Sequence, residues 1–169
     1  MNDIQADGFL LRREKVPIEP PAIQYDQTLR PAWDELSPAE RLILWSIRAL
    51  AETLNNWPQV QKELWLCCGP VTIETVLQAL HEMLTILAVH HRRKLNVRKL
   101  GNPRLSADEV TVLTLIAAAQ DGQFYKLEAI ASWLVCDKGH DAVKAAACQF
   151  AEGLSRSGIE LASLGRRAE

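Results

Sequence analysis

The densest group of charged side chains lies in one short stretch, HHRRKLNVRKLGNPR, which runs from His90 to Arg104. It contains no carboxylate, and its six basic residues are Arg92, Arg93, Lys94, Arg98, Lys99 and Arg104. Cations near a helix C-terminus interact favourably with the helix dipole, by about 0.3–1 kcal/mol each, which explains only part of this group. The excess predicts a surface that binds anions, either the phosphates of nucleic acid or an acidic protein surface. A solvated surface without a ligand is the alternative.

Histidine and cysteine are the other residue types that could do chemistry. Cys136 and His140 stand four residues apart, yet no second pair has the spacing of a zinc finger or ribbon. Neighbours such as His90 and His91 point in different directions on a helix, so they cannot easily share one ion. We therefore predict no metal site and no cofactor. The four cysteines are too few and too irregularly spaced for a disulfide scaffold, and we expect reduced thiols.

No motif typical of catalysis occurs in the chain. Glu74 and His81 share the polar side of a predicted helix but lie about 10 Å apart along its axis, too far for a direct hydrogen bond. The sequence has no GxSxG turn, glycine-rich phosphate loop or HExxH pair. We predict no catalytic residue. An enzyme whose residues meet only in three dimensions is the third hypothesis for function.

Length and composition are those of a single globular domain. The chain has 169 residues, 48% of them hydrophobic, and a formal net charge of -2, which gives no overall attraction to nucleic acid or anionic lipid. Its apolar runs are interrupted well before the roughly 20 residues that span a bilayer. Residues 1–20 lack the apolar centre of a secretory signal. These features predict a cytoplasmic protein that does not enter a membrane.

The first 33 residues differ from the remainder of the chain. They contain Pro17, Pro20, Pro21 and Pro31, and proline disfavours a long regular helix. Several apolar side chains are interspersed with these prolines. We therefore divide the chain into an extended arm, residues 1–33, and a helical domain, residues 34–169.

The helical domain begins with a clear start signal. Ser37 and Glu40 form a capping box around Pro38, and an apolar stripe follows at helical spacing. A second, short helix is expected from Pro58 to about residues 67–70. The long helix predicted next, residues 71–94, is apolar around most of its circumference. It is expected to pass through the centre of the domain or to contribute one face to a dimer.

Four residues near these helices are candidates for an interface. His90 and His91 close the two apolar stripes of the long helix, where their ring nitrogens can reach water. Trp57 and Trp65 lie on the short helix before it. An exposed tryptophan there would favour contact with an apolar segment of a partner, since aromatic residues are enriched at interfaces.

The second half of the chain is also predicted to be helical. Ser106 and Glu109 repeat the capping box and open a helix that is broken at Asp121 and Gly122. Two more helices follow, the second starting near Asp141, and a last turn is expected in residues 157–169. The prediction is an all-α fold, a single-domain helical bundle of six to seven helices.

Part of this half has a pattern known from transcription factors. LSADEVTVLTLIAA, AIASWL and DAVKAAACQF follow one another within residues 105–154. Together they resemble the DNA-binding region of LuxR-type regulators, which implies a helix-turn-helix. The connection before AIASWL and the turn after it are longer than in that pattern. The would-be recognition helix offers only Lys144 and Gln149 for reading bases, amid alanines that favour close helix packing.

Binding is the function that these features favour. The leading hypothesis is a non-enzymatic regulatory or adaptor protein that binds a protein partner or a second copy of itself. The alternative is a DNA-associated regulator that uses the basic segment 92–104 and the helix-turn-helix-like region 105–154. Neither hypothesis names the partner.

Overall fold

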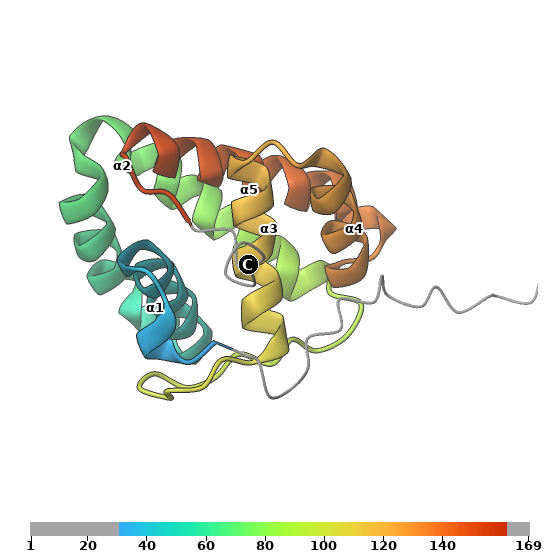
Figure 1. The fold of residues 1–169 in the computed structure, drawn as a ribbon, viewed down its shortest axis with the longest axis horizontal. Helices are drawn as coiled ribbons and strands as arrows, with labels where there is room; N and C mark the ends of the chain where they lie inside the picture. Colours follow the sequence, from blue (N-terminus) through green and yellow to red (C-terminus); the bar gives the residue numbers. More distant parts are fainter. Residues whose placement is uncertain (1–30, 162–169) are drawn as a thin grey trace, which may run out of the picture.

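The structure is a computed structural model, and it describes residues 31–161 of the chain (Figure 1). Within this range the chain is all-α, as predicted, with α1 (Pro38–Glu52), α2 (Trp57–His90), α3 (Ala107–Gln120), α4 (Phe124–Leu134) and α5 (Asp137–Arg156). Two short 3-10 helices, η1 (Trp33–Glu35) and η2 (Leu54–Asn56), precede α1 and α2. The predicted arm, residues 1–33, lies outside the described residues except for its last three.

The described residues form five α-helices, fewer than the six to seven predicted. The second and third predicted helices are two parts of α2, residues 57–68 and 70–90, which meet at Gly69. Gly69 has φ 73° and ψ 175°, a left-handed φ that suits glycine, and Pro70 begins the second part. The last predicted helical turn is not formed in residues 157–161, which begin with a simple turn at residues 157–158, and its remaining residues lie outside the described range.

Helix α3 occupies the centre of the fold, a position for which the apolar pattern of residues 71–94 also made them a candidate. Its residues from Asp108 to Ala118 are all buried, with α1, α4 and α5 packed around it. Residues 70–90 instead bury one side, which includes Val76, Leu80 and Met83. Their opposite side remains exposed at Glu74, Gln78 and His81. Burial around the whole circumference, which was considered for the long helix, is therefore found in α3.

The ends of two elements differ from the prediction. Helix α2 ends at His90, so Arg92, Arg93 and Lys94 follow the helix and do not belong to it. Helix α5 starts at Asp137, four residues before the predicted start at Asp141. The glycine at position 139 lies in its first turn, and this turn packs against the end of α2.

Glycine allows α2 and α5 to approach closely along their lengths. A Cβ atom added to Gly139 would lie 2.5 Å from the Cβ of His90. A Cβ added to Gly153 would lie 2.7 Å from Cγ2 of Val76. Both distances are far below van der Waals contact, so any larger residue would force the two helices apart.

Both predicted capping boxes are present, and the second is joined to a buried ion pair. Ser106 accepts a hydrogen bond from the backbone N–H of Glu109, which in turn accepts one from the N–H of Ser106. The Glu109 carboxylate also accepts two hydrogen bonds from Arg48 of α1, at 2.8 and 3.0 Å. Both side chains are almost completely buried. This pair fixes the start of α3 against α1.

One stretch of the described chain, Leu54–His90, is long and apolar enough to cross a membrane by length and composition alone. A core helix of a soluble protein passes the same test, so this is weak evidence. The break at Gly69 divides the stretch, and its outer side carries Glu74, Gln78 and Glu82.

Candidate functional site

The basic stretch belongs to a connecting segment, residues 91–106, that joins α2 to α3. Backbone hydrogen bonds fix both of its ends. Near its start the N–H of Arg92 donates to Leu134 O at 3.1 Å, just beyond the hydrogen bond from Cys136 N–H to His90 O. Near its end the N–H of Trp33 donates to Pro103 O at 2.8 Å. The connecting segment is therefore anchored to the α4–α5 junction and to the residues before α1.

Two of its six basic side chains make internal contacts that hold the segment in place. Arg92 donates to Val135 O at 2.9 Å and to the carboxylate of Asp137 at 3.2 Å. Arg93 pairs with both carboxylate oxygens of Asp108, at 3.1 and 2.5 Å. Its guanidinium also lies 4.3 Å from the ring centroid of Trp133, a cation–π contact. These arginines stabilise the fold through direct contacts.

The remaining four basic residues have different surroundings. The backbone N–H of Arg98 donates to the Glu109 carboxylate at 2.8 Å, while its buried Nε has no acceptor within the described residues. Lys94, Lys99 and Arg104 are exposed. Of the six, only Lys94 lines the cavity described next.

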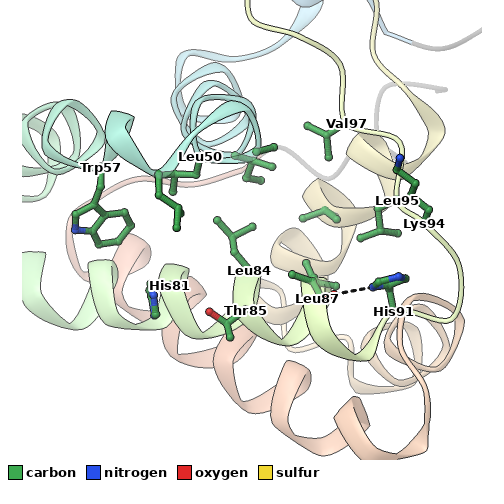
Figure 2. A pocket seen from close by; sticks show the side chains of 15 residues that line it. Leu50, Trp57, His81, Leu84, Thr85, Leu87, His91, Lys94, Leu95 and Val97 are labelled. Carbon is green, nitrogen blue, oxygen red and sulfur yellow. Dashed lines mark hydrogen bonds between the residues drawn. The ribbon is translucent and has the colours of Figure 1, made fainter.

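An apolar cavity of about 440 Å³ lies between α1, η2, α2, α3 and the connecting segment (Figure 2). Leucine, valine, isoleucine and alanine make up most of its wall, and a few polar groups stand at its edges. Its lining residues are Ile47, Leu50, Ala51, Leu54, Trp57, His81, Leu84, Thr85, Leu87, Ala88, His91, Lys94, Leu95, Val97 and Val112. Cavities of about 300–1,000 Å³ with an apolar wall and few polar groups are typical of ligand sites.

The ring and charged groups lie at two ends of this cavity, and Thr85 lies between them (Figure 2). Trp57 and His81 occupy one end, with ring centroids 5.8 Å apart in an edge-to-face arrangement. His91 and Lys94 lie at the other end, on the connecting segment. The Nδ1 atom of His91 is 2.8 Å from Ala88 O, which orients the imidazole. The Lys94 ammonium gives this second end a positive charge.

The structure therefore brings together two of the four predicted interface residues. Trp57 and His91 line the same cavity, although they are distant in sequence. His90 packs against Gly139 at the start of α5, and Trp65, about half exposed, lies on the first part of α2 and outside the cavity wall. Sequence reasoning missed the cavity itself. Its available signal was the apolar pair Leu95 and Val97 within an otherwise basic stretch.

A second polar cluster, absent from the sequence predictions, joins α4 to α5. Ser132 Oγ lies 2.9 Å from His140 Nε2, and His140 Nδ1 lies 3.4 Å from the Asp141 carboxylate. Glu128 Oε1 lies 3.1 Å from the same Nε2, and Glu128 also binds Lys144. This order of groups resembles that of a catalytic triad. However, Ser132 is inside a helix, where backbone N–H groups are already bonded and offer no oxyanion hole.

Electrostatics within this cluster follow from its ion pairs. Hydrogen bonding and charge attraction from Lys144 lower the pKa of the exposed Asp141 carboxyl. Glu128 and then Asp141 raise the pKa of the Lys144 ammonium. Both groups are thus charged over a wide pH range around neutrality, and they connect α4 to α5 as a surface ion-pair network.

Helix α5, the would-be recognition helix, faces inward over much of its surface. Val143, Ala147 and Phe150 are buried, and Lys144 is bound to Glu128 and Asp141. Gln149 lies beside the α2–α5 contact, at a second, shallower hollow. A base-reading helix must present its polar residues to the major groove. Here the polar side chain best suited to that task, Lys144, already has two carboxylate partners.

Among the described residues, no group of three or more metal-ligating side chains could hold a metal ion. The four cysteines are free thiols. Burial raises the pKa of the Cys68 and Cys148 thiols, which keeps them protonated and poorly nucleophilic at neutral pH. Comparison with models of protein families, with curated proteins and with solved structures found no match.

Proposed function

We propose that this protein is a non-enzymatic regulatory or adaptor protein of the cytoplasm, and that its apolar cavity binds an acidic segment of a protein partner. One observation carries the proposal: the apolar cavity has a positively charged side chain, Lys94, at one end. The wall would receive apolar side chains of the partner, and Lys94 would attract a carboxylate close to them.

The chemistry of the cavity favours a peptide over nucleic acid. Burying apolar surface contributes about 25 cal/mol per Å² of favourable free energy. An apolar wall therefore stabilises bound apolar side chains but does not stabilise phosphates. Trp57 adds a large, rigid contact surface with few rotatable bonds, which is a frequent property of binding hot spots. The neighbouring Lys99 and Arg104 are exposed and extend the positive charge along the connecting segment.

Selection of peptides provides a direct test. The full chain would be used to select binders from a displayed peptide library, with counter-selection on the Ala88→Trp variant. Ala88 is exposed and lines the cavity, so an indole there would occupy the cavity without replacing a core residue. Val89→Trp is the matched control, because Val89 is its exposed neighbour outside the cavity wall.

We expect the selected peptides to be acidic, with two or more apolar residues, and to bind wild type and Val89→Trp but not Ala88→Trp. Anisotropy of the labelled peptides would measure this. Peptides that bind all three proteins equally, or a selection that yields no binder, would overturn the proposal. Sedimentation at several concentrations would show whether a second copy of the chain is such a partner.

The DNA-associated alternative makes a separate prediction. A protein that contacts phosphates releases counterions, so its affinity for a mixed-sequence duplex falls steeply with salt. Replacing Lys94, Lys99 and Arg104 by alanine would then reduce the salt slope without removing the internal contacts of Arg92 and Arg93. Absence of duplex binding even at low salt would exclude this alternative.

A further inference from the structure

We propose that the cavity is occupied by the chain's own residues 16–26, VPIEPPAIQYD, and that a partner must displace them to bind. This inference rests on the proposed function, because it assigns a resident occupant to the same cavity. It would make the protein autoinhibited, with its affinity for partners set by an internal competitor.

The composition of residues 16–26 matches the cavity. The segment has four apolar or aromatic side chains suited to the wall, Val16, Ile18, Ile23 and Tyr25, in addition to its prolines and alanine. It contains two carboxylates, Glu19 and Asp26, and no basic residue. These charges are complementary to Lys94 at the end of the cavity and to the neighbouring cations of the connecting segment.

The point where this segment joins the fold is close to the cavity wall. Trp33 is hydrogen-bonded to Pro103, and Ala32 forms an antiparallel bridge with Arg104. Val97, in the wall, is six residues from Pro103 and hence at most about 21 Å away. Tyr25 is eight residues from Trp33, a reach of up to about 28 Å. The segment is therefore long enough to enter the cavity.

Two physical effects favour this internal occupant. Three prolines restrict the backbone of residues 16–26, so less conformational entropy is lost when the segment binds. The tether also gives the segment an effective concentration on the order of millimolar. A contact that is weak between separate molecules is then well populated within one chain.

The test compares two labelled peptides from the chain itself, residues 16–26 and residues 1–11. Both have eleven residues, two carboxylates and no basic side chain, so they match in length and charge once their ends are capped. Each peptide would be titrated by fluorescence anisotropy into the full chain, wild type and Ile18→Asp/Ile23→Asp. Phe9→Asp/Leu11→Asp would serve as the control for changes in the arm.

We expect peptide 16–26 to bind Ile18→Asp/Ile23→Asp about tenfold more tightly than wild type, since the internal competitor is disabled there. Phe9→Asp/Leu11→Asp should behave as wild type. Peptide 1–11, which lacks proline, should bind Ile18→Asp/Ile23→Asp at least tenfold more weakly than peptide 16–26 does. Adding Ala88→Trp to Ile18→Asp/Ile23→Asp should abolish the binding of peptide 16–26. Adding Ala51→Trp, a second cavity-blocking change on α1, to the same protein should have the same result. Circular dichroism would check that both blocked proteins keep their helical content.

Three results would overturn the inference: equal binding of both peptides, no binding of peptide 16–26 to any variant, or binding that survives both cavity-blocking variants. If library-selected peptides still bind in a manner that depends on Ala88, the proposed function stands without the autoinhibition. If they also fail, both proposals fall together.

Discussion

The two sides of residues 70–90 in α2 are packed in opposite ways. Toward α5, glycine residues let the backbones approach so closely that a single added methyl group at Gly139 would overlap with His90. Toward α1 and the connecting segment, large side chains such as Leu50, Trp57 and Leu84 hold the elements apart and leave the cavity. One helix thus serves as a rigid support on one side and as a wall of a binding site on the other.

This difference shows which contacts keep the cavity open. Protein interiors normally reach close packing, so an apolar hollow between helices persists only where its walls are held independently. Here the close α2–α5 contact holds one wall. The buried pair of Arg48 and Glu109, together with Arg93 and Asp108, holds the connecting segment that forms another. Changes to these supports therefore test the comparison directly.

The largest loss of stability is expected from Glu109→Ala. It would leave Arg48 as a buried cation without its carboxylate, which typically costs about 3–5 kcal/mol. It would also remove the acceptor for the backbone N–H of Arg98, releasing the cavity wall. Urea unfolding would measure the loss. Glu52→Ala, which removes an exposed carboxylate that binds the Leu100 N–H, is the control and should cost much less.

A smaller loss is expected when the closely packed side is disturbed. Gly139→Ala would normally favour a helix, yet its Cβ would overlap with the Cβ of His90, which cannot move without its backbone. We expect destabilisation by about 1–3 kcal/mol, typical of overpacking. Lys138→Ala, one residue earlier and exposed, should be nearly neutral. An unchanged or raised melting temperature of Gly139→Ala would contradict the close contact.

Arg93→Ala should lower the free energy of unfolding by less than the two changes above, because the arginine is half exposed, although its partner Asp108 is buried. The variant loses two charged hydrogen bonds and the contact with Trp133, and the half-exposed position of Arg93 limits the expected loss to about 1–2 kcal/mol. Lys99→Ala is the control and should leave stability unchanged. Equal free energies of unfolding for the two variants would mean that Arg93 contributes no more to stability than an exposed surface charge does.

The smallest effect concerns the ion pairs between α4 and α5. Because Lys144 lowers the pKa of Asp141, this pair stabilises the fold above the ordinary carboxyl pKa, and the contribution is lost as pH falls through the lowered value. Lys144→Met should raise the pKa of Asp141 toward its usual range, which NMR titration of the carboxyl carbon would detect. Lys138→Met should leave it unaltered.

The sequence predicted the helical class and most helix starts correctly and some element ends incorrectly, and it left open which helix is central. The capping boxes at Ser37 and Ser106 and the break near Gly69 were recognisable because each depends on neighbouring residues. The early start of α5 at Asp137 was missed because Gly139 looked like a turn signal. Its role as a contact point for His90 depends on a residue 49 positions away in the chain.

The candidate site was predictable only in fragments. Trp57 and His91 were identified one by one, and the basic stretch as a unit. Arg92 and Arg93 could not be separated from Lys94 by sequence, since all three are neighbouring cations. Their surroundings distinguish them: Val135, Asp137 and Asp108 receive the two arginines, whereas Lys94 lies at the cavity.

By itself, the sequence determined where most of the helices begin, where α2 breaks and how charge is distributed along the chain. Those features depend on hydrogen bonds and steric limits among residues a few positions apart. Only the tertiary structure decided which cations are engaged, which helix is central and where the cavity lies. These depend on contacts such as Arg48 with Glu109, 61 residues apart, whose distances are set by the packing of whole helices.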